Sequence, residues 1–248
     1  MKVAAYQSPL LAAGSMEALE LIRNRVKWCE AEGVAILCCP EAILGGLADY
    51  AEDPSEFAVA VDGGGFLNAL APLASDTVTT IVGFTELGGV GRFYNSAAVF
   101  ERGTVVGVYR KLHPAIRQSV YEAGSEVPIF HVSGLTFGIA ICNDSNFPDP
   151  ARLMAAQGAT ALFVPTNNGL PEERDHAEMV AAARKADIAM AIGNRMWVIR
   201  SDVAGSNGKL VSYGSSEIVD PEGAVVQTAR RRMGEDLIVA EIGTTGRG

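Results

Sequence analysis

The sequence of 248 residues lacks long apolar runs and is poor in basic residues, and each shortage narrows what the chain can be. No stretch approaches 18 uninterrupted apolar residues, so we expect no transmembrane helix. Its 20 Lys and Arg are outnumbered by 29 Asp and Glu, and the net charge of -9 argues against nucleic acid or a membrane as the main partner. Gln7, Ser8 and Pro9 interrupt the apolar start of the chain too early for a targeting peptide, so residues 3–8 are interpreted as a first strand.

Cysteine is also scarce. The four cysteines form no CxxC pair and have no metal-type spacing with the three histidines, so we expect no metal site. Cys38 and Cys39 are adjacent, which suits no structural disulfide framework, and the chain is expected in a reducing cytoplasm. The first strand is followed by no Gly-rich phosphate loop, which excludes a flavodoxin-like binding protein.

What is present is an alternation of apolar strands and amphipathic helices without any linker-like tract. We therefore expect one α/β domain over residues 1–248, with mixed sheets because several strands are joined by hairpins. Helices are expected from the Ser15 cap to about Gly33 and over 66–74, 151–157 (capped by Asp149) and 175–192. Strands are expected at 3–8, 34–39, 79–86, 94–100, 105–109, 129–142 in two pieces, 161–165, 197–203, 210–220, 225–228 and 237–242; residues 42–65 are expected to be a loop that lines a pocket.

The stretch 135–150 has the pattern of a catalytic turn. An apolar run of strand length ends at Cys142, and polar residues and two prolines then lead into a helix. A nucleophile at such a strand end shares a cleft with the backbone N–H groups that follow it. A buried cysteine is by itself more often inert packing, so the rest of the chain has to decide.

Two further polar residues follow apolar strands: Glu41 after 34–39, and Lys111 after 105–109. With Cys142 they form a sensible chemical set. A carboxylate can take the thiol proton during attack, and an ammonium favours the thiolate and stabilises the oxyanion of a tetrahedral intermediate. The N–H of Asn143 is the expected second oxyanion donor. The set suits acyl transfer from a C–N bond to Cys142, followed by hydrolysis.

At these residues the sequence resembles the nitrilase superfamily of carbon–nitrogen hydrolases. The matching pieces are CPEAIL around Glu41, YNSAAVF at 94–100, YRKLHP around Lys111, ICNDSNFPDPAR around Cys142, and YGSSEIVDPEG at 213–223. They occur in the family's order and spacing across nearly the whole chain. The resemblance implies a four-layer α-β-β-α sandwich with two mixed sheets, and no cofactor. It also implies a homodimer or larger homo-oligomer, and a triad of Glu41 as general base, Lys111 as oxyanion cation and Cys142 as nucleophile.

The chain departs from the family pattern at a second glutamate that many members carry seven residues before the glycine of a Pro-Gly pair. Counting back from Gly124 leads to Arg117, and the nearby Glu122 is the only acidic alternative in this segment before Gly124. Arg117 is interpreted as a surface residue, with a substrate carboxylate as its other possible partner. A fourth catalytic carboxylate is therefore in doubt.

The residues after Cys142 bear on the substrate. Cys-Asn-Asp at 142–144 resembles N-carbamoyl-D-amino-acid hydrolases, but Ser145 and Asn146 stand where those enzymes have arginines that hold the substrate carboxylate. We therefore favour a neutral amide or an unusual carbamoyl compound over a carbamoyl amino acid. We expect Asn146, Thr166 and Asn167 to hydrogen-bond the substrate, with turn capping as the alternative role.

The sequence thus predicts an amidase that releases ammonia from a small amide through a Cys142 thioester. An N-carbamoyl-amine or amino-acid amidohydrolase is the nearest alternative, followed by a nitrilase. A catalytically idle dimeric interaction protein is the alternative from another class, and the joint presence of Glu41, Lys111 and Cys142 argues against it.

Overall fold

The computed structural model describes residues 1–15, 17–62, 64–89, 91–115 and 118–244, and four α-helices and fourteen strands lie within them. The α-helices are α1 (Glu17–Glu32), α2 (Gly64–Leu70), α3 (Pro148–Ala156) and α4 (His176–Asn194), and the short 3-10 helices include η1 (Ala48–Tyr50), η2 (Pro54–Glu56) and η4 (Cys142–Asn146). The strands are β1 (Lys2–Pro9), β2 (Ile36–Cys38), β3 (Thr79–Leu87), β4 (Phe93–Glu101), β5 (Thr104–Arg110), β6 (Ile129–Val132), β7 (Leu135–Ile139), β8 (Ala161–Pro165), β9 (Trp197–Ser201), β10 (Val203–Ser206), β11 (Val211–Tyr213), β12 (Glu217–Val219), β13 (Val225–Thr228) and β14 (Asp236–Glu241).

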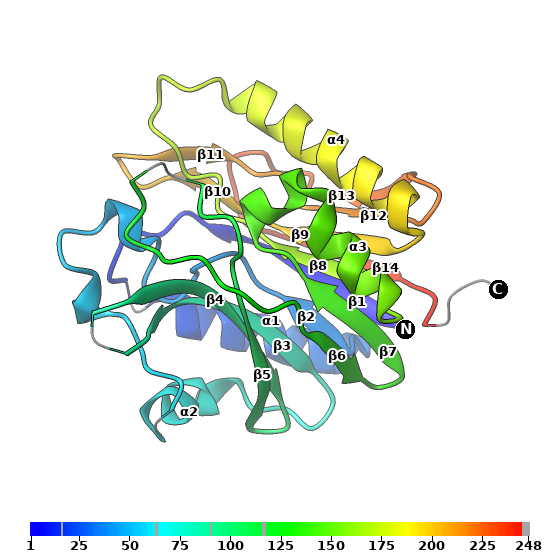
Figure 1. Ribbon diagram of the computed structural model, residues 1–248, viewed down its shortest axis with the longest axis horizontal. Coiled ribbons are helices and arrows are strands. Elements are labelled where there is room, and N and C mark those ends of the chain that lie inside the picture. The colour runs from blue at the N-terminus through cyan, green and yellow to red at the C-terminus, as the bar shows by residue number, and fades with distance from the viewer. Residues whose placement is uncertain (16, 63, 90, 116–117, 245–248) are drawn as a thin grey trace.

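The strands form two mixed sheets that lie face to face between two layers of helices (Figure 1). The first sheet has the order β11-β10-β1-β2-β3-β4-β5, with β14 also paired to β1, and the second has the order β13-β12-β9-β8-β7-β6. The parallel strands are β10-β1-β2-β3 in the first sheet and β7-β8-β9 in the second, and the strands that continue each sheet on either side are antiparallel. The expected α-β-β-α sandwich with two mixed sheets is confirmed.

Alternation along the strands explains the layers. In β1, Ala4 and Tyr6 pack in one core cluster with Ile22 of α1, whereas Val3 and Ala5 pack in a second cluster that lies between the sheets. Successive side chains of a strand point to opposite faces, so a fully apolar strand is buried on both. Helices α3 and α4 contribute to the second cluster from the other side of the second sheet.

Two strands that the sequence predicts as continuous are each divided between the sheets. The predicted strand 197–203 becomes β9 in the second sheet and β10 in the first, with the chain crossing at Asp202; the predicted strand 210–220 becomes β11 and β12, with the chain crossing back at 214–216. The buried Asp202 carboxylate accepts hydrogen bonds from the N–H groups of Val203 and Ser215, which ties the two crossings together. Hydrophobic periodicity carries no sign of such a sheet change.

The helix predicted at 151–157 begins earlier than expected. Its N-cap is Phe147 and its first residue is Pro148, so Asp149 lies inside the first turn and pairs there with Arg152. Pro148 has no N–H to lose and a φ angle already suited to a helix, which makes it the better starting residue. The predicted loop 42–65 contains η1 and η2, and its residues 46–57 contribute to the wall of a cavity.

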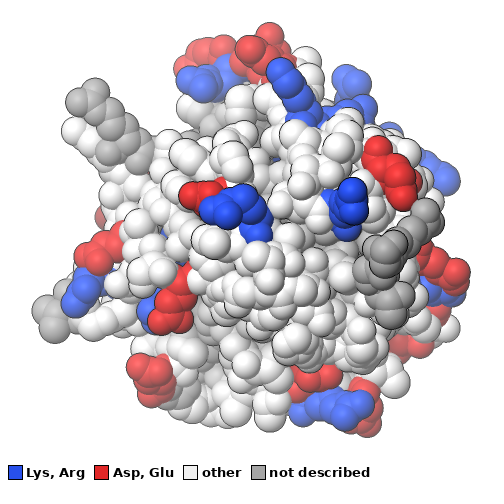
Figure 2. Space-filling view, turned by 45° about the vertical axis from the view of Figure 1, so that its right-hand side comes forward, with Lys and Arg blue, Asp and Glu red and all other residues white. Residues whose placement is uncertain are grey.

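Charged side chains of both signs are interspersed over the face that Figure 2 presents. None of the helices that the structure describes is both long and apolar enough to cross a bilayer.

Candidate active site

The three candidate catalytic residues follow strands of both sheets and meet in one cavity. Glu41 comes after β2 and Lys111 directly after β5 in the first sheet, and Cys142 comes after β7 in the second. All three line a cavity of about 60 Å³, and the side chains of Glu41 and Lys111 are almost fully buried. The structure therefore brings together the three residues that the sequence predicts as a triad.

The Glu41 carboxylate is held on both of its oxygens. Its Oε1 accepts hydrogen bonds from Lys111 Nζ at 2.5 Å and Asn95 Nδ2 at 2.8 Å, and its Oε2 accepts one from the backbone N–H of Asn167 at 2.8 Å. A buried carboxylate needs such partners because an unpaired charge in a low dielectric is costly. The contacts leave Glu41 with a fixed orientation toward the cavity.

Gly83 of β3 allows the backbone that carries Glu41 to approach the sheet. A Cβ atom at this position would lie 2.4 Å from the carbonyl oxygen of Pro40 and 2.9 Å from the Cα of Glu41. Both are rigid backbone atoms, so any side chain here displaces the segment. Gly83 also accepts a hydrogen bond from the N–H of Leu44, which fixes the turn after Glu41.

Cys142 stands at the sharp turn from β7 into η4. Its φ angle is +46°, in the left-handed region that residues with a Cβ rarely adopt, and such strain persists only where the surroundings enforce it. It is the first residue of η4, and the first N–H groups of a helix have no acceptor within the helix. The N–H of Asn143 belongs to this first turn, and its role as an oxyanion donor stays a prediction.

The electrostatics of the cavity keep the resting Cys142 protonated. Burial, together with the nearby Glu41 carboxylate, raises the pKa of the Cys142 thiol to about 12, although Lys111 and Arg200 lower it. Burial alone would lower the pKa of Lys111, but Glu41 and Cys142 raise it above its ordinary value, so Lys111 is an ammonium. The cation favours the thiolate as expected from the sequence, but it does not generate a resting thiolate.

Asp144 ties the segment after Lys111 to the segment after the candidate nucleophile. Its fully buried carboxylate accepts hydrogen bonds from Tyr109 Oη at 2.8 Å, from the N–H of His113 at 2.8 Å and from the N–H of Ile141 at 3.0 Å. Asp144 thus has a structural role: it holds together the segment after β5 and the segment after β7.

A second buried cluster supports the turn from the side of α4. Arg200 of β9 makes a bidentate ion pair with Asp187 of α4, at 2.6 and 2.5 Å, and donates to Thr166 Oγ1 and to Ser145 Oγ. The Ser145 hydroxyl in turn donates to the carbonyl oxygen of Cys142 at 2.8 Å. Asp187 thus pairs with Arg200, whereas Arg184 on the same helix pairs with Glu217.

Of the residues predicted to bind substrate, the structure brings Asn167 to the cavity wall. Thr166 is engaged with Arg200, Asn143 donates through its side chain to the carbonyl oxygen of His113, and Asn146 donates to the side chain of Asn143. Asn146 thus braces the turn, the alternative role that the sequence leaves open for it. Asn143 and Asn146 are not among the described residues of the cavity wall.

Glu122 is not brought to the cavity either. Its N–H bonds the carbonyl oxygen of Phe93, and its half-exposed carboxylate lies 3.7 Å from Arg92 and 3.5 Å from Tyr94 Oη. Glu122 is not among the described residues of the triad cavity wall, so the structure does not bring it to the triad. Arg117, where the count from Gly124 leads, lies outside the described residues.

Sequence reasoning missed two asparagines. Asn95 of β4 holds Glu41, and Asn168 places its Oδ1 3.9 Å from Cys142 Sγ while its Nδ2 donates to Asp202 and Ser215. Asn95 lies within the quoted YNSAAVF segment, where a buried amide in the middle of a strand is the available signal. Asn168 follows β8 in the same way that Glu41 follows β2.

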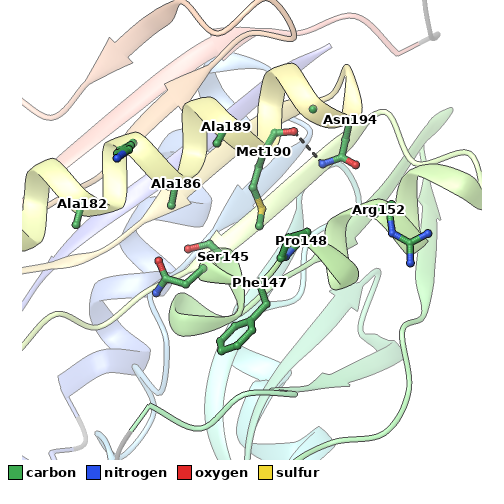
Figure 3. Close-up of a pocket in the computed structure, with 12 residues that line it drawn as sticks. Ser145, Phe147, Pro148, Arg152, Ala182, Ala186, Ala189, Met190 and Asn194 are labelled. Carbon is green, nitrogen blue, oxygen red and sulfur yellow. Dashed lines mark hydrogen bonds between the residues drawn. The ribbon is translucent and has the colours of Figure 1, made fainter.

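A larger cavity of about 550 Å³ lies away from the triad, between the 145–148 segment and α4 (Figure 3). Phe147 and Pro148 form one side of it, and Ala182, Ala186 and Ala189 form the other. Its wall contains none of Glu41, Lys111 and Cys142, so the smaller cavity is the candidate reaction site. Within the part of the chain that the structure describes, no three His, Cys, Asp or Glu side chains gather as a metal site requires.

The fold and the site define a class of enzyme, and comparison with known proteins agrees with it. A family model described as carbon-nitrogen hydrolase matches residues 2–246, and the chain belongs to this family. It is an amidase-like hydrolase of the nitrilase superfamily.

Two relatives indicate the breadth of the family. The chain is 29% identical over 250 residues to "Hydrolase in pqqF 5'region" of Pseudomonas protegens, covering 98% of this chain and 82% of the relative. It is 32% identical over 164 residues to the N-carbamoylputrescine amidase of Solanum tuberosum, covering 60% of this chain and 54% of that enzyme.

Solved structures share the fold. The chain matches an amidase from Nesterenkonia sp. with a TM-score of 0.81 at 19% identity, covering 99% of this chain and 91% of that one. It matches Nit3 of Saccharomyces cerevisiae, a member of branch 10 of the nitrilase superfamily, with a TM-score of 0.81 at 21% identity, covering 97% and 89%.

Proposed function

We propose that this protein hydrolyses a linear amide to a carboxylic acid and ammonia through a thioester on Cys142. The observation that carries the proposal is the convergence of Glu41, Lys111 and Cys142 on one cavity, with Glu41 and Lys111 joined by a 2.5 Å ion pair. Amidases among the similar proteins, including the deaminated glutathione amidase of Synechocystis at 28% identity, support the reaction class.

In the first half of the reaction, Glu41 takes the proton from Cys142 as Sγ attacks the amide carbon. This general base is needed because the pKa of the partly buried Cys142 thiol is raised to about 12. The oxygen of the tetrahedral intermediate receives hydrogen bonds from the Lys111 ammonium and the N–H of Asn143. Protonated Glu41 then donates its proton to the amide nitrogen, the C–N bond breaks, and ammonia leaves.

In the second half, water attacks the thioester carbon while Glu41 accepts one of its protons. The new intermediate has the same oxyanion donors, and its collapse breaks the C–S bond and releases the acid. The proton held by Glu41 returns to Cys142 Sγ, which restores the starting state. No cofactor enters this scheme.

The amide is favoured over a carbamoyl amino acid because the described cavity wall contains no arginine that could clamp a substrate carboxylate. An N-carbamoyl amine is the second candidate, on the strength of the N-carbamoylputrescine amidase relative. Both classes begin with attack by Cys142 and release ammonia, but the carbamoyl amine passes through a thiocarbamate and also yields carbon dioxide and the amine.

Ammonia release from small amides, ω-amides, carbamoyl amines, carbamoyl amino acids and nitriles tests the proposal, with the Cys142→Ala variant as the blank. Release from amides that is lost in the variant is expected. Ammonia release from carbamoyl amines alone would mean that the substrate is an N-carbamoyl amine, the second candidate, rather than an amide. Ammonia release that persists in Cys142→Ala would refute the assignment of Cys142 as the nucleophile. No release from any compound, combined with a Cys142 that iodoacetamide does not alkylate, would favour the catalytically idle interaction protein.

We also infer a cytoplasmic location and a homodimer or larger homo-oligomer. The four cysteines are unpaired in the structure, which suits a reducing compartment. The cavity beside α4 exposes Phe147 and a row of small side chains, a surface that a second copy of the chain can cover.

A further inference from the structure

The cavity that holds the triad has room for a reacting group and little else. Its volume of about 60 Å³ is small beside the 430 Å³ of the cavity that adjoins it. The body of any longer substrate must therefore lie elsewhere.

A second cavity of about 430 Å³, here called the outer pocket, adjoins it. The two cavities share Leu47, Tyr50 and Asn167 as wall residues. Leu47 is the N-cap of η1 and Tyr50 is its last residue, and the N–H of Tyr50 donates a hydrogen bond to the carbonyl oxygen of Leu47. The Tyr121 hydroxyl accepts a hydrogen bond from the N–H of Ala48 at 2.8 Å and so fixes this dividing wall from the inside.

The wall of the outer pocket combines apolar and acidic side chains. Leu10, Leu11, Phe57 and Leu210 supply apolar surface. The charged groups among its described wall residues are Glu52, Asp53, Glu56 and Lys209, three carboxylates against one ammonium. Asp53 is engaged with Ser55 as the cap of η2, and Arg174 is the next cation, close enough to Tyr50 to lower its pKa against the effect of burial.

We propose that the substrate is an extended linear amide whose chain passes Tyr50 into the outer pocket and ends there in an ammonium group rather than a carboxylate. The inference rests on the proposed amidase function and narrows its substrate class. The chain packs on the leucines, and the acidic wall residues attract the cationic end. The carboxylates are solvated, so the preference between ends is moderate and falls with added salt.

The experiment compares kcat/KM for acetamide, hexanamide, ε-aminocaproamide and adipamate. We expect hexanamide to exceed acetamide by about tenfold or more, since each buried methylene contributes roughly 0.8 kcal/mol. At low ionic strength ε-aminocaproamide should exceed adipamate by about threefold to tenfold, and added salt should shrink the ratio.

Two variants localise the effect. Leu210→Trp narrows the outer pocket outside the catalytic cavity and should lower kcat/KM for hexanamide by a larger factor than that for acetamide. Glu52→Gln/Glu56→Gln should abolish the preference for the ammonium end. The matched control is Glu20→Gln/Glu241→Gln, which alters the net charge equally at two exposed residues that are not part of the pocket.

Each outcome has a distinct meaning. Equal rates for acetamide and hexanamide, or equal losses for both in Leu210→Trp, would overturn the inference and leave the amidase intact. A higher kcat/KM for adipamate than for ε-aminocaproamide would overturn the assigned ammonium end. So would a ratio of the two that changes as much in the control variant as in Glu52→Gln/Glu56→Gln. No hydrolysis of any of the four amides would overturn the proposed function, and this inference with it.

Discussion

At the scale of the residue, the chemistry of the site depends on where the proton of the Cys142 thiol is held. Cys142 is held as a thiol by burial and by Glu41, and Glu41 is held by two neutral donors besides Lys111. A resting thiol protects the enzyme from adventitious alkylation and oxidation, since the thiolate is the reactive form. In the proposed reaction Glu41 takes this proton only as the thiol attacks the substrate.

The Lys111→Met variant tests the electrostatic part of this account. Lys111 lowers the pKa of Cys142 against the larger effect of burial, so its removal should move the alkylation profile to higher pH. At a fixed pH below 9, iodoacetamide should then react at least about tenfold more slowly, the equivalent of one pKa unit. The rate should still rise with pH in both proteins.

The measurement is the second-order alkylation rate of Cys142 between pH 6 and 10, followed by mass spectrometry. Lys185→Met is the control, because Lys185 lies on α4 away from the triad cavity. Superimposable profiles for Lys111→Met and wild type would show that the ammonium does not act on the thiol.

At the scale of the element, the site depends on how closely a loop can approach a strand. Gly83→Ala places a methyl group against the backbone of Pro40 and Glu41, at distances that no rotamer change can relieve. We expect kcat to fall by about tenfold or more, since small misplacements of catalytic groups are costly. Circular dichroism should remain that of the wild type.

Gly65→Ala is the matched control for this prediction. Gly65 lies in α2, has an ordinary φ angle and leaves open space around an added Cβ. Its activity should equal that of the wild type. Unchanged kcat in Gly83→Ala would mean that the position of Glu41 tolerates the displacement.

The ion pair between α4 and β9 gives a prediction about stability. Arg200→Met leaves the Asp187 carboxylate buried without its cation, and such a change costs about 3–5 kcal/mol of unfolding free energy. The double variant Arg200→Met/Asp187→Leu should regain most of that loss, because it removes both charges. Urea unfolding monitored by fluorescence gives the values.

The exposed pair of Arg152 and Asp149 is the comparison for the same chemistry in water. Arg152→Met should change the unfolding free energy by less than about 1 kcal/mol. A loss in Arg200→Met no larger than this would remove the argument that the pair supports the turn at Cys142.

The elements also show what a sequence can and cannot predict. The strands before Glu41, Lys111 and Cys142 were predictable because apolar runs that end in a polar residue are local patterns. The division of 197–203 at Asp202 was not, since β9 and β10 are separated by a single residue and only tertiary pairing assigns them to different sheets. Asn95 and Asn168 escaped for the same reason: their partners lie 54 and 26 residues away in the chain.

At the scale of the whole molecule, neither sheet carries the site alone. Glu41, Asn95 and Lys111 come from the first sheet, whereas Cys142 and Asn167 follow strands of the second. The inter-sheet core therefore fixes the geometry of the triad, and damage to that core should reach catalysis. Asp202, at the crossing between the sheets, links this core to Asn168 beside Cys142.

The assembly of the molecule is the last prediction. One face of α4, opposite Phe147, carries small residues at helical spacing, and such residues allow a second helix to approach closely; they are Ala182, Ala186, Ala189 and Gly193.

Light scattering should give a mass of twice 26.0 kDa or more for the wild type. Ala189→Glu should shift it toward the monomer, because an unpaired carboxylate resists burial in an interface. Ala181→Glu, at an exposed alanine of the same helix outside this cavity, should not. A monomeric wild type would contradict the homo-oligomer, whereas a dimer indifferent to both variants would locate its interface elsewhere.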